Sequence, residues 1–262
     1  MQILPKALIA AGALTAGLSS SIAFAQTAPA APAAAPAAPE STLAFKVSAW
    51  TEYEYRGISQ TSEKPAGQLN IDYGHPSGFY LGTFVSNIKW LKDAAEVGGF
   101  STSAKIEWDI FGGYKFEVMK DLTLDVGYLR YEYPSSGVFS PKPNTDEIYI
   151  GATYGPVSVK YSYSINDTFG VPNSEGSDFI EANLAYPLTE KLTLTGNVGY
   201  QKYKNNNALS YTVYKIGAAY DLGSGFSVGG YYKSTDADEA LYTYKGKDWG
   251  KARGVAFVAY AF

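Results

Sequence analysis

The sequence feature that most constrains the fold is the alternation in the final segment, Gly254 to Phe262. Counting back from Phe262 by twos gives Tyr260, Val258, Ala256 and Gly254, so one face of a strand carries an apolar file that ends in an aromatic residue. A terminal aromatic in this position is typical of the strand that closes a membrane β-barrel, where it acts as an assembly signal. The rest of the chain must then repeat the alternation.

The beginning of the sequence predicts an exported protein. A short basic start and an apolar stretch precede Ala23-Phe24-Ala25, a small-x-small cleavage site. The apolar stretch is shorter than the roughly 20 residues that a membrane-spanning helix requires, so residues 1–25 are predicted to be a signal peptide. Residues 26–41 are almost entirely Ala and Pro and cannot bury a core. They predict a periplasmic linker, which leaves 42–262 for the folded domain.

Composition narrows the class of protein further. The chain has 262 residues, no Cys, one His, 23 Tyr and 27 Gly. Beyond the signal peptide, no window is apolar over the roughly 18 residues that a membrane helix needs, whereas a membrane β-barrel needs apolar residues only at alternate positions. The absence of Cys excludes thiol catalysis and Cys-based metal sites. The net charge of −4 argues against a nucleic-acid partner.

Alternation between an apolar file and a polar file recurs along the whole domain. Twelve segments show the strand pattern, and this even number is what a closed antiparallel membrane barrel requires. The phase of the third segment is ambiguous. The twelve predicted strands cover residues 43–56, 68–73, 79–87, 105–114, 122–128, 147–154, 157–164, 180–186, 192–201, 214–221, 226–233 and 251–262.

The connections carry an independent signal. Links after the even-numbered strands are short, while those after the odd-numbered strands are mostly longer and polar, the arrangement of periplasmic turns and extracellular loops. A soluble lipocalin-type barrel would place the apolar files inside. We favour the inverted arrangement because twelve strands enclose too wide a space for apolar side chains to fill. Tyrosines at the ends of apolar files also predict an aromatic girdle: Tyr55, Tyr73, Tyr128, Tyr154, Tyr163, Tyr186, Tyr200, Tyr220, Tyr232 and Tyr260.

Short motifs along the domain resemble the TorF family of proteins assigned as outer-membrane porins. The resemblance runs from about Leu43 to Phe262 and implies an outer-membrane barrel with a porin-like role, without established catalytic residues or a known solute. The motifs are Tyr55-Arg56-Gly57-Ile58-Ser59-Gln60, Gly78-Phe79-Tyr80, Gly112-Gly113-Tyr114, Lys160-Tyr161-Ser162-Tyr163-Ser164, and Thr235-Asp236-Ala237-Asp238 with Ala240-Leu241-Tyr242-Thr243.

Residues suited to catalysis are few. The single His, His75, lies in a tight turn with Ser77, which is a poor place for a base held against a nucleophile. The pair Glu52 and Glu54 lies two residues apart on one strand face, as does the pair Glu107 and Asp109. Such pairs can support acid–base chemistry, but lining a wet lumen is the simpler role, and no enzyme activity is predicted.

Asp236 and Asp238 are the one candidate for a metal site. They resemble half of a calcium loop but lack the Gly and the closing Glu of an EF-hand. A solvated acidic loop and a Ca²⁺ or Mg²⁺ site that bridges lipopolysaccharide both remain open. No cofactor is predicted.

The charges of the polar files predict a selectivity lining, because strand direction gives each residue a height in the barrel. Four cations should cluster near the outer mouth where the last strands meet the first, and four carboxylates should occupy the upper wall opposite. An arc of cations that faces an arc of carboxylates creates a transverse field across the lumen, although the charges could instead pair across the barrel and plug it. The cations are Arg56, Lys233, Lys251 and Arg253, and the carboxylates are Glu107, Asp109, Glu147 and Glu181.

These features together predict an all-β, twelve-stranded up-and-down barrel in the outer membrane of a Gram-negative bacterium. Strand spacing and tilt give a cylinder roughly 24 Å across between backbones, with an opening on the order of 10 Å or less. The expected function is passive diffusion of ions and small hydrophilic solutes. Outer-membrane lipid and lipopolysaccharide, the barrel-assembly machinery acting on Phe262, and further copies of the chain are the expected partners.

Two other functions remain open at this point. One is a non-conducting surface protein that acts through loop aromatics such as Trp90, Phe100, Phe139 and Phe169, in adhesion or membrane integrity. The other is an outer-membrane lipid enzyme, for which His75 is the single candidate base.

Overall fold

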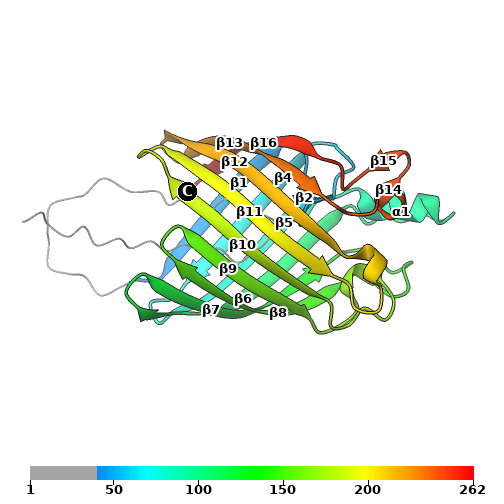
Figure 1. The fold of residues 1–262 in the computed structure, drawn as a ribbon, viewed down its shortest axis with the longest axis horizontal. Helices are drawn as coiled ribbons and strands as arrows, with labels where there is room; N and C mark the ends of the chain where they lie inside the picture. Colours follow the sequence, from blue (N-terminus) through cyan, green and yellow to red (C-terminus); the bar gives the residue numbers. More distant parts are fainter. Residues whose placement is uncertain (1–39) are drawn as a thin grey trace, which may run out of the picture.

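A computed structural model of the protein describes residues 40–262 as a closed antiparallel barrel (Figure 1). The predicted signal peptide and all but the last residues of the predicted linker lie outside the described residues. The fold confirms the predicted twelve-stranded wall. Its strands are β1 (Thr42–Trp50), β4 (Ala66–Gly74), β5 (Phe79–Asn87), β6 (Ile106–Met119), β7 (Leu122–Glu132), β8 (Thr145–Tyr154), β9 (Val157–Ser164), β10 (Asp178–Pro187), β11 (Leu192–Lys202), β12 (Tyr211–Gly223), β13 (Phe226–Thr235) and β16 (Arg253–Ala261).

The last strand closes the wall. β16 pairs with β13 on one side and with β1 on the other, with Val47 opposite Tyr260 in the second pairing. Phe262 continues this ladder, since its backbone N–H and C=O both hydrogen-bond to Phe45 at 3.0 Å and its ring stacks on that of Phe45, with centroids 5.5 Å apart. Closure leaves no unpaired strand edge in the wall.

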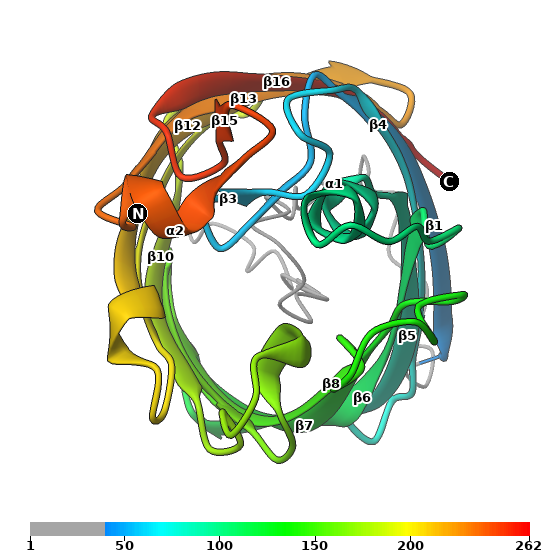
Figure 2. The ribbon, with the colours of Figure 1, turned by 90° about the vertical axis from the view of Figure 1, so that its right-hand side faces the viewer.

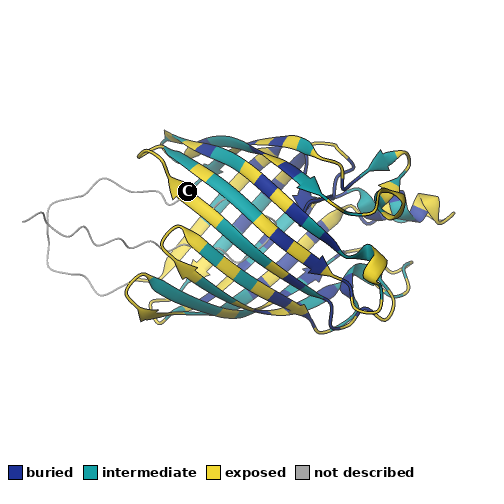
Figure 3. Ribbon diagram, in the orientation of Figure 1, coloured by how far each residue is buried: buried dark blue, intermediate teal, exposed yellow. Residues whose placement is uncertain are grey.

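The apolar files point outward. Ile216 is 71% exposed and Leu43 is 60% exposed, whereas Trp50 and Phe257 on the opposite faces of β1 and β16 are buried. Exposed and more buried positions alternate along the strands in Figure 3. A continuous apolar outer surface would cost about 25 cal/mol per Å² in water and is stable only against lipid. The structure therefore excludes the lipocalin-type arrangement.

The tyrosine girdle is present with one correction. Outward tyrosines such as Tyr73, Tyr154 and Tyr220 are exposed at strand ends. Tyr55 was predicted to belong to this set but is buried inside the barrel, because the chain leaves the wall after Trp50. The first predicted strand therefore ends six residues earlier than its alternation suggests.

Loop length distinguishes the two ends of the barrel. Short turns such as 155–156 and 224–225 lie at one end, and long connections lie at the other, as predicted (Figure 1). Within the described residues, no helix is long and apolar enough to cross a membrane. The long connections contain β2 (Glu54–Tyr55), β3 (Ile58–Ser59), α1 (Trp90–Val97), η1 (Thr168–Gly170), η2 (Asn207–Leu209), α2 (Glu239–Tyr242), β14 (Thr243–Tyr244) and β15 (Lys247–Asp248).

Candidate functional site: the constricted lumen

The connection between β1 and β4 folds into the barrel, and we call residues 51–65 the inner hairpin. Its strands β2 and β3 are joined by Arg56 and Gly57, which both have positive φ, at 48° and 85°. Two positive φ angles define the tight hairpin turn whose twist matches paired strands. A Cβ on Gly57 would lie 2.5 Å from Cγ2 of Thr235 and 2.7 Å from Cγ2 of Val213, so glycine lets the turn press against the wall. Figure 2 shows β3 inside the outline of the barrel.

Arg56 anchors the tip of the inner hairpin to the wall. Its guanidinium donates to both carboxylate oxygens of Glu147 on β8, at 2.9 and 2.8 Å, and to Oε1 of Gln201 on β11 at 2.8 Å. Arg56 is 7% exposed and Glu147 is 1% exposed. Two parallel charge-assisted bonds fix both distance and orientation. Arg56 is therefore joined to Glu147 instead of facing it across an open passage, which is where the structure departs from the predicted arcs.

A second anchor centres on Glu54. Its carboxylate accepts hydrogen bonds from Lys215, from the hydroxyl of Tyr231 at 2.9 Å and from the backbone N–H of Gly57 at 2.6 Å. Lys233 extends the anchor, since its Nζ donates to the carbonyl of Gly57 at 2.7 Å. The predicted lining residue Lys233 thus holds backbone carbonyls and is fully buried.

Tyrosines join the inner hairpin to the acidic wall. The Tyr53 hydroxyl donates to Glu107, which also accepts from Tyr133 at 2.8 Å. Asp109 lies two residues further along β6 and is completely buried, and neither of its oxygens has a hydrogen-bond partner within the described part of the chain. Glu107 and Asp109 both face inward, but only Glu107 is held by hydrogen bonds from neighbouring side chains.

Among the remaining predicted lining residues, Arg253 is also joined to the inner hairpin. Arg253 donates to Glu52 at 3.1 Å and pairs with Glu63 at 3.1 Å. Partial burial by itself raises the pKa of the Glu63 carboxyl. The hydrogen bond from Lys247 and the positive charge of Arg253 outweigh burial and hold that pKa below its ordinary value. Lys251 is exposed in the connection before β16 and not within that strand. Glu181 is half-buried and accepts from Asn197 at 2.9 Å.

Deeper in the lumen lies a belt of charged residues that the sequence analysis did not include in the selectivity lining. Lys115 on β6 pairs with Asp125 on β7 at 3.9 Å, and Asp125 also accepts from the Tyr80 hydroxyl at 2.6 Å. Lys160 on β9 lies over the Tyr149 ring at 4.2 Å. All these residues belong to inward files, so the same alternation could have identified them.

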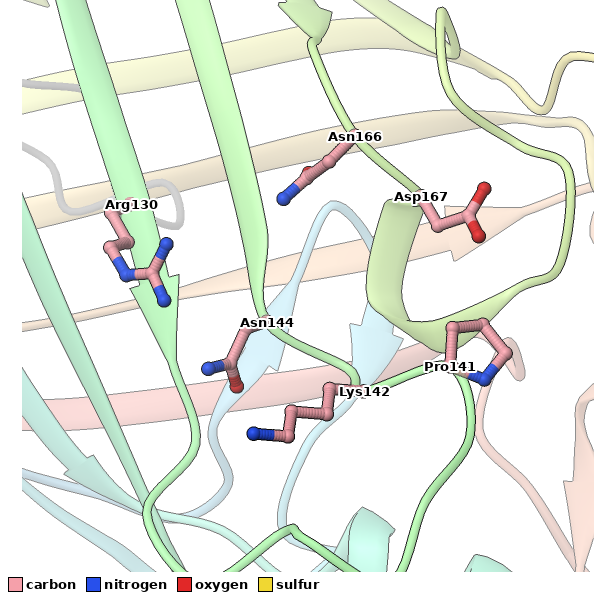
Figure 4. Close-up of a pocket in the computed structure, with 6 residues that line it drawn as sticks. All are labelled: Arg130, Pro141, Lys142, Asn144, Asn166 and Asp167. Atoms are coloured by element: carbon pink, nitrogen blue, oxygen red, sulfur yellow. The ribbon is translucent and has the colours of Figure 1, made fainter.

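Two hollows lie at the loop end. An open depression on the rim is lined by side chains from β7 and the two following long connections (Figure 4): Arg130, Pro141, Lys142, Asn144, Asn166 and Asp167. Its Arg130 is already paired with Glu132 at 2.7 Å and with Asp146 at 3.0 Å. The second hollow, which we call the vestibule cavity, has a volume of about 160 Å³ and lies against the inner hairpin. All its lining residues are uncharged.

The candidate catalytic and metal-binding side chains form hydrogen bonds within a turn, at a helix N-terminus and to the backbone. The His75 ring bonds to the Ser77 hydroxyl at 2.7 Å within one exposed turn. Asp238 caps α2 by accepting from the N–H of Ala240 at 2.9 Å, and Asp236 accepts from the backbone N–H of Thr212. Within residues 40–262, no group of three or more His, Cys, Asp or Glu side chains is arranged to hold a metal ion.

Comparisons with known proteins give a family and a fold. A family model described as "Bacterial protein of unknown function (Gcw_chp)" matches residues 33–262. A search of curated proteins finds no match to this sequence. Among solved structures, a KdgM porin and a NanC porin each superpose with a TM-score of 0.53 at 11% identity, over 84% of this chain and 99% of the other. A KdgM porin in complex with disordered oligogalacturonate gives a TM-score of 0.52 at 11% identity, over 85% and 99% of the two chains.

These findings support the porin-like fold that the sequence predicted. A sequence identity of 11% shows a similar fold and nothing further. The resemblance to the TorF family is not confirmed, because the matching family is Gcw_chp, and it stays a prediction.

Proposed function

Since the chain belongs to the Gcw_chp family and folds as a closed barrel with apolar files outside, we propose that it is an outer-membrane channel for passive diffusion of small hydrophilic solutes. The observation that carries the proposal is the contrast between the two faces of one wall. Apolar side chains cover the outside, while ion pairs and tyrosine hydroxyls occupy the inside. Such an interior suits water and polar solutes, because lipid offers no partner to charged groups.

The inner hairpin sets the size limit of the proposed passage. It is tied to β8, β11, β12 and β13 by Arg56, Glu54 and Gly57, so it is held across the lumen at a fixed height. Discrimination by a narrow, polar constriction is the usual basis of selectivity in channels. We expect small ions and metabolites to pass and folded proteins to be excluded.

Recording from purified protein in planar lipid bilayers tests the proposal. Stepwise conductance supports a channel, and its absence at high protein content would overturn it. Reversing Arg56 and Arg253 to Glu in a conducting protein should shift the current towards cations, because both side chains lie at the constriction. Unchanged selectivity would remove these residues from the lining. The matched control is Lys92→Glu on the exposed surface of α1.

The alternative of a surface protein loses part of its motivation. The loop aromatics that suggested it pack on one another: Phe100 contacts Phe139 with centroids 5.3 Å apart, and Phe169 contacts Tyr131 at 5.2 Å. A lipid enzyme is also disfavoured, since the His75–Ser77 pair is confined to one exposed turn. Turnover of a phospholipid by purified protein would favour that enzyme over a channel.

The localisation and the partners belong to the same proposal. A barrel with an apolar outer surface is suited to the outer membrane of a Gram-negative bacterium, where lipid contacts its wall and lipopolysaccharide contacts its rim. Recognition of Phe262 by the assembly machinery and self-association of the barrel remain parts of the proposal. Extraction in mild detergent followed by light scattering tests the self-association of the barrel.

A further inference from the structure

The vestibule cavity lies directly above the constriction. It is lined by Tyr55, Ile58 and Gln60 of the inner hairpin, by residues at the ends of β11 and β12, and by residues of the long connections. Figure 2 shows the long connections around the mouth. Gln201 also lines it and accepts from Arg56, so the cavity is continuous with the anchor of the hairpin. A solute approaching from the loop side meets this cavity before it meets the constriction.

The cavity has the size of one six-membered ring. Its volume of about 160 Å³ is close to the roughly 150 Å³ of an engineered protein cavity that accepts benzene. Eight of its fourteen lining residues are aromatic. The rings of Tyr244 and Trp249 are stacked face to face, 4.1 Å apart at an angle of 11°, so the pair offers a ligand one outer ring face. A ligand with an apolar ring face can lie against such a surface.

The polar groups of the cavity restrict the ligand further. Trp90 and Trp249 both line it, and the indole nitrogen of each is buried without a hydrogen-bond partner among the described residues. An indole N–H can only donate, so its partner must be an acceptor. A buried polar group left unpaired is costly, and a ligand that carries oxygen acceptors removes this cost once a small shift of the indole ring opens its N–H to the cavity.

The charge of the cavity excludes an ionic ligand. None of its lining residues is charged, and the nearby cation Arg56 already makes two bonds to Glu147. A carboxylate or phosphate bound here would lose its hydration without gaining a free cation. A benzene-like ring would leave the two indole N–H groups unpaired.

We propose that the vestibule cavity is a binding site for a neutral pyranose sugar. The C–H face of the sugar lies on the outer face of the Tyr244–Trp249 stack, and its ring or hydroxyl oxygens accept from the indole N–H groups of Trp90 and Trp249. The assignment of this sugar as a transported solute rests on the proposed channel function, whereas its binding does not.

Titration of the purified full-length protein in detergent tests the site. Two of the four tryptophans line the cavity, so intrinsic fluorescence reports on its occupancy. D-Glucose is expected to produce a saturable change with a Kd on the order of 1 mM, and D-glucuronate, which differs by a carboxylate, to bind at least about tenfold more weakly. The absence of saturation with glucose, equal binding of glucuronate, or binding of phenol with glucose inert would each overturn the proposal.

Variants distinguish the site from a general effect on the protein. Trp249→Phe removes an indole N–H and keeps an aromatic ring, and Tyr244→Leu removes one ring of the stack. Each is expected to weaken glucose binding at least about tenfold. The control is Trp108→Phe on the outer face of β6, where the indole donates to Thr83 at 2.7 Å. Circular dichroism confirms that each variant is folded, and wild-type glucose binding by both cavity variants would refute the site.

Bilayer recording separates this proposal from the proposed channel. Glucose binding without any conductance would leave the site in place and remove the channel. Conductance without glucose binding would leave the channel and remove the site.

Discussion

Replacing Arg56 by Gln should release the tip of the inner hairpin. The substitution removes the two bonds to Glu147, at 2.8 and 2.9 Å, and leaves that carboxylate buried with Tyr131 at 3.2 Å as a weaker partner. Removing one member of a buried ion pair typically costs about 3–5 kcal/mol, because the other charge stays desolvated. At about 1.4 kcal/mol per tenfold change, the detached state of the hairpin becomes more than about a hundredfold more populated.

Hydrogen exchange of the backbone amides of residues 51–65 measures this release, because exchange of a protected segment follows its local opening. Single-channel recording of Arg56→Gln should show more frequent openings to a larger conductance. The double variant with Glu147→Gln leaves two neutral amides and should recover about 1–3 kcal/mol of the loss, as expected for a coupled pair.

The matched control is Arg130→Gln. Arg130 also pairs with two carboxylates, but it is 39% exposed on the outer rim, so its loss should cost at most about 1 kcal/mol and leave exchange of the hairpin unchanged. The reasoning fails if Arg56→Gln exchanges as slowly as the wild type. It also fails if the costs of the two single variants simply add in the double variant.

Three further variants test other parts of the structure, each by urea unfolding in lipid. Gly57→Ala places a Cβ 2.7 Å from Cγ2 of Val213 at a φ of 85°, so it should lower the stability of the barrel, or of the attachment of the hairpin to the wall, by about 1–3 kcal/mol. Unchanged urea unfolding together with unchanged hydrogen exchange would contradict the close packing at Gly57. Ile216→Lys places a charge on the lipid face and should cost about 2–4 kcal/mol, whereas Thr195→Lys, which faces the lumen, should cost less; equal costs would contradict the assignment of faces. Asp109→Leu removes a buried carboxyl whose oxygens lack partners among the described residues and should raise stability by about 1–3 kcal/mol; a loss would show that Asp109 has a stabilising role.

The wall could be predicted from sequence because lipid imposes a simple rule. Every second residue of a strand must be apolar, and a slip of one residue would place charges such as Glu107 in hydrocarbon. This rule also settles the phase of β5, which sequence left ambiguous: Leu81 is exposed and Phe84 is buried, so the odd-numbered residues of this strand face lipid.

The inner hairpin could not be predicted by the same rule. Tyr53 and Tyr55 continue the apolar file of β1, and alternation is satisfied equally well by aromatic residues that bury themselves within the lumen. The local signal was the pair Arg56-Gly57, where a glycine follows a run of alternating residues and permits a tight turn. The partner of Arg56 depends on which wall residues reach the same height, and this requires the strand register that only the structure supplies.

Pairing of charges inside the barrel changes what can discriminate between solutes. Four inner carboxylates are each joined to one cation: Glu52 to Arg253, Glu54 to Lys215, Asp125 to Lys115 and Glu147 to Arg56. A close pair of opposite charges has a weak field at a distance, so a strong transverse field across the passage is not what these contacts provide. In the proposed channel, size at the inner hairpin and contacts in the vestibule cavity would then be the main means of selection.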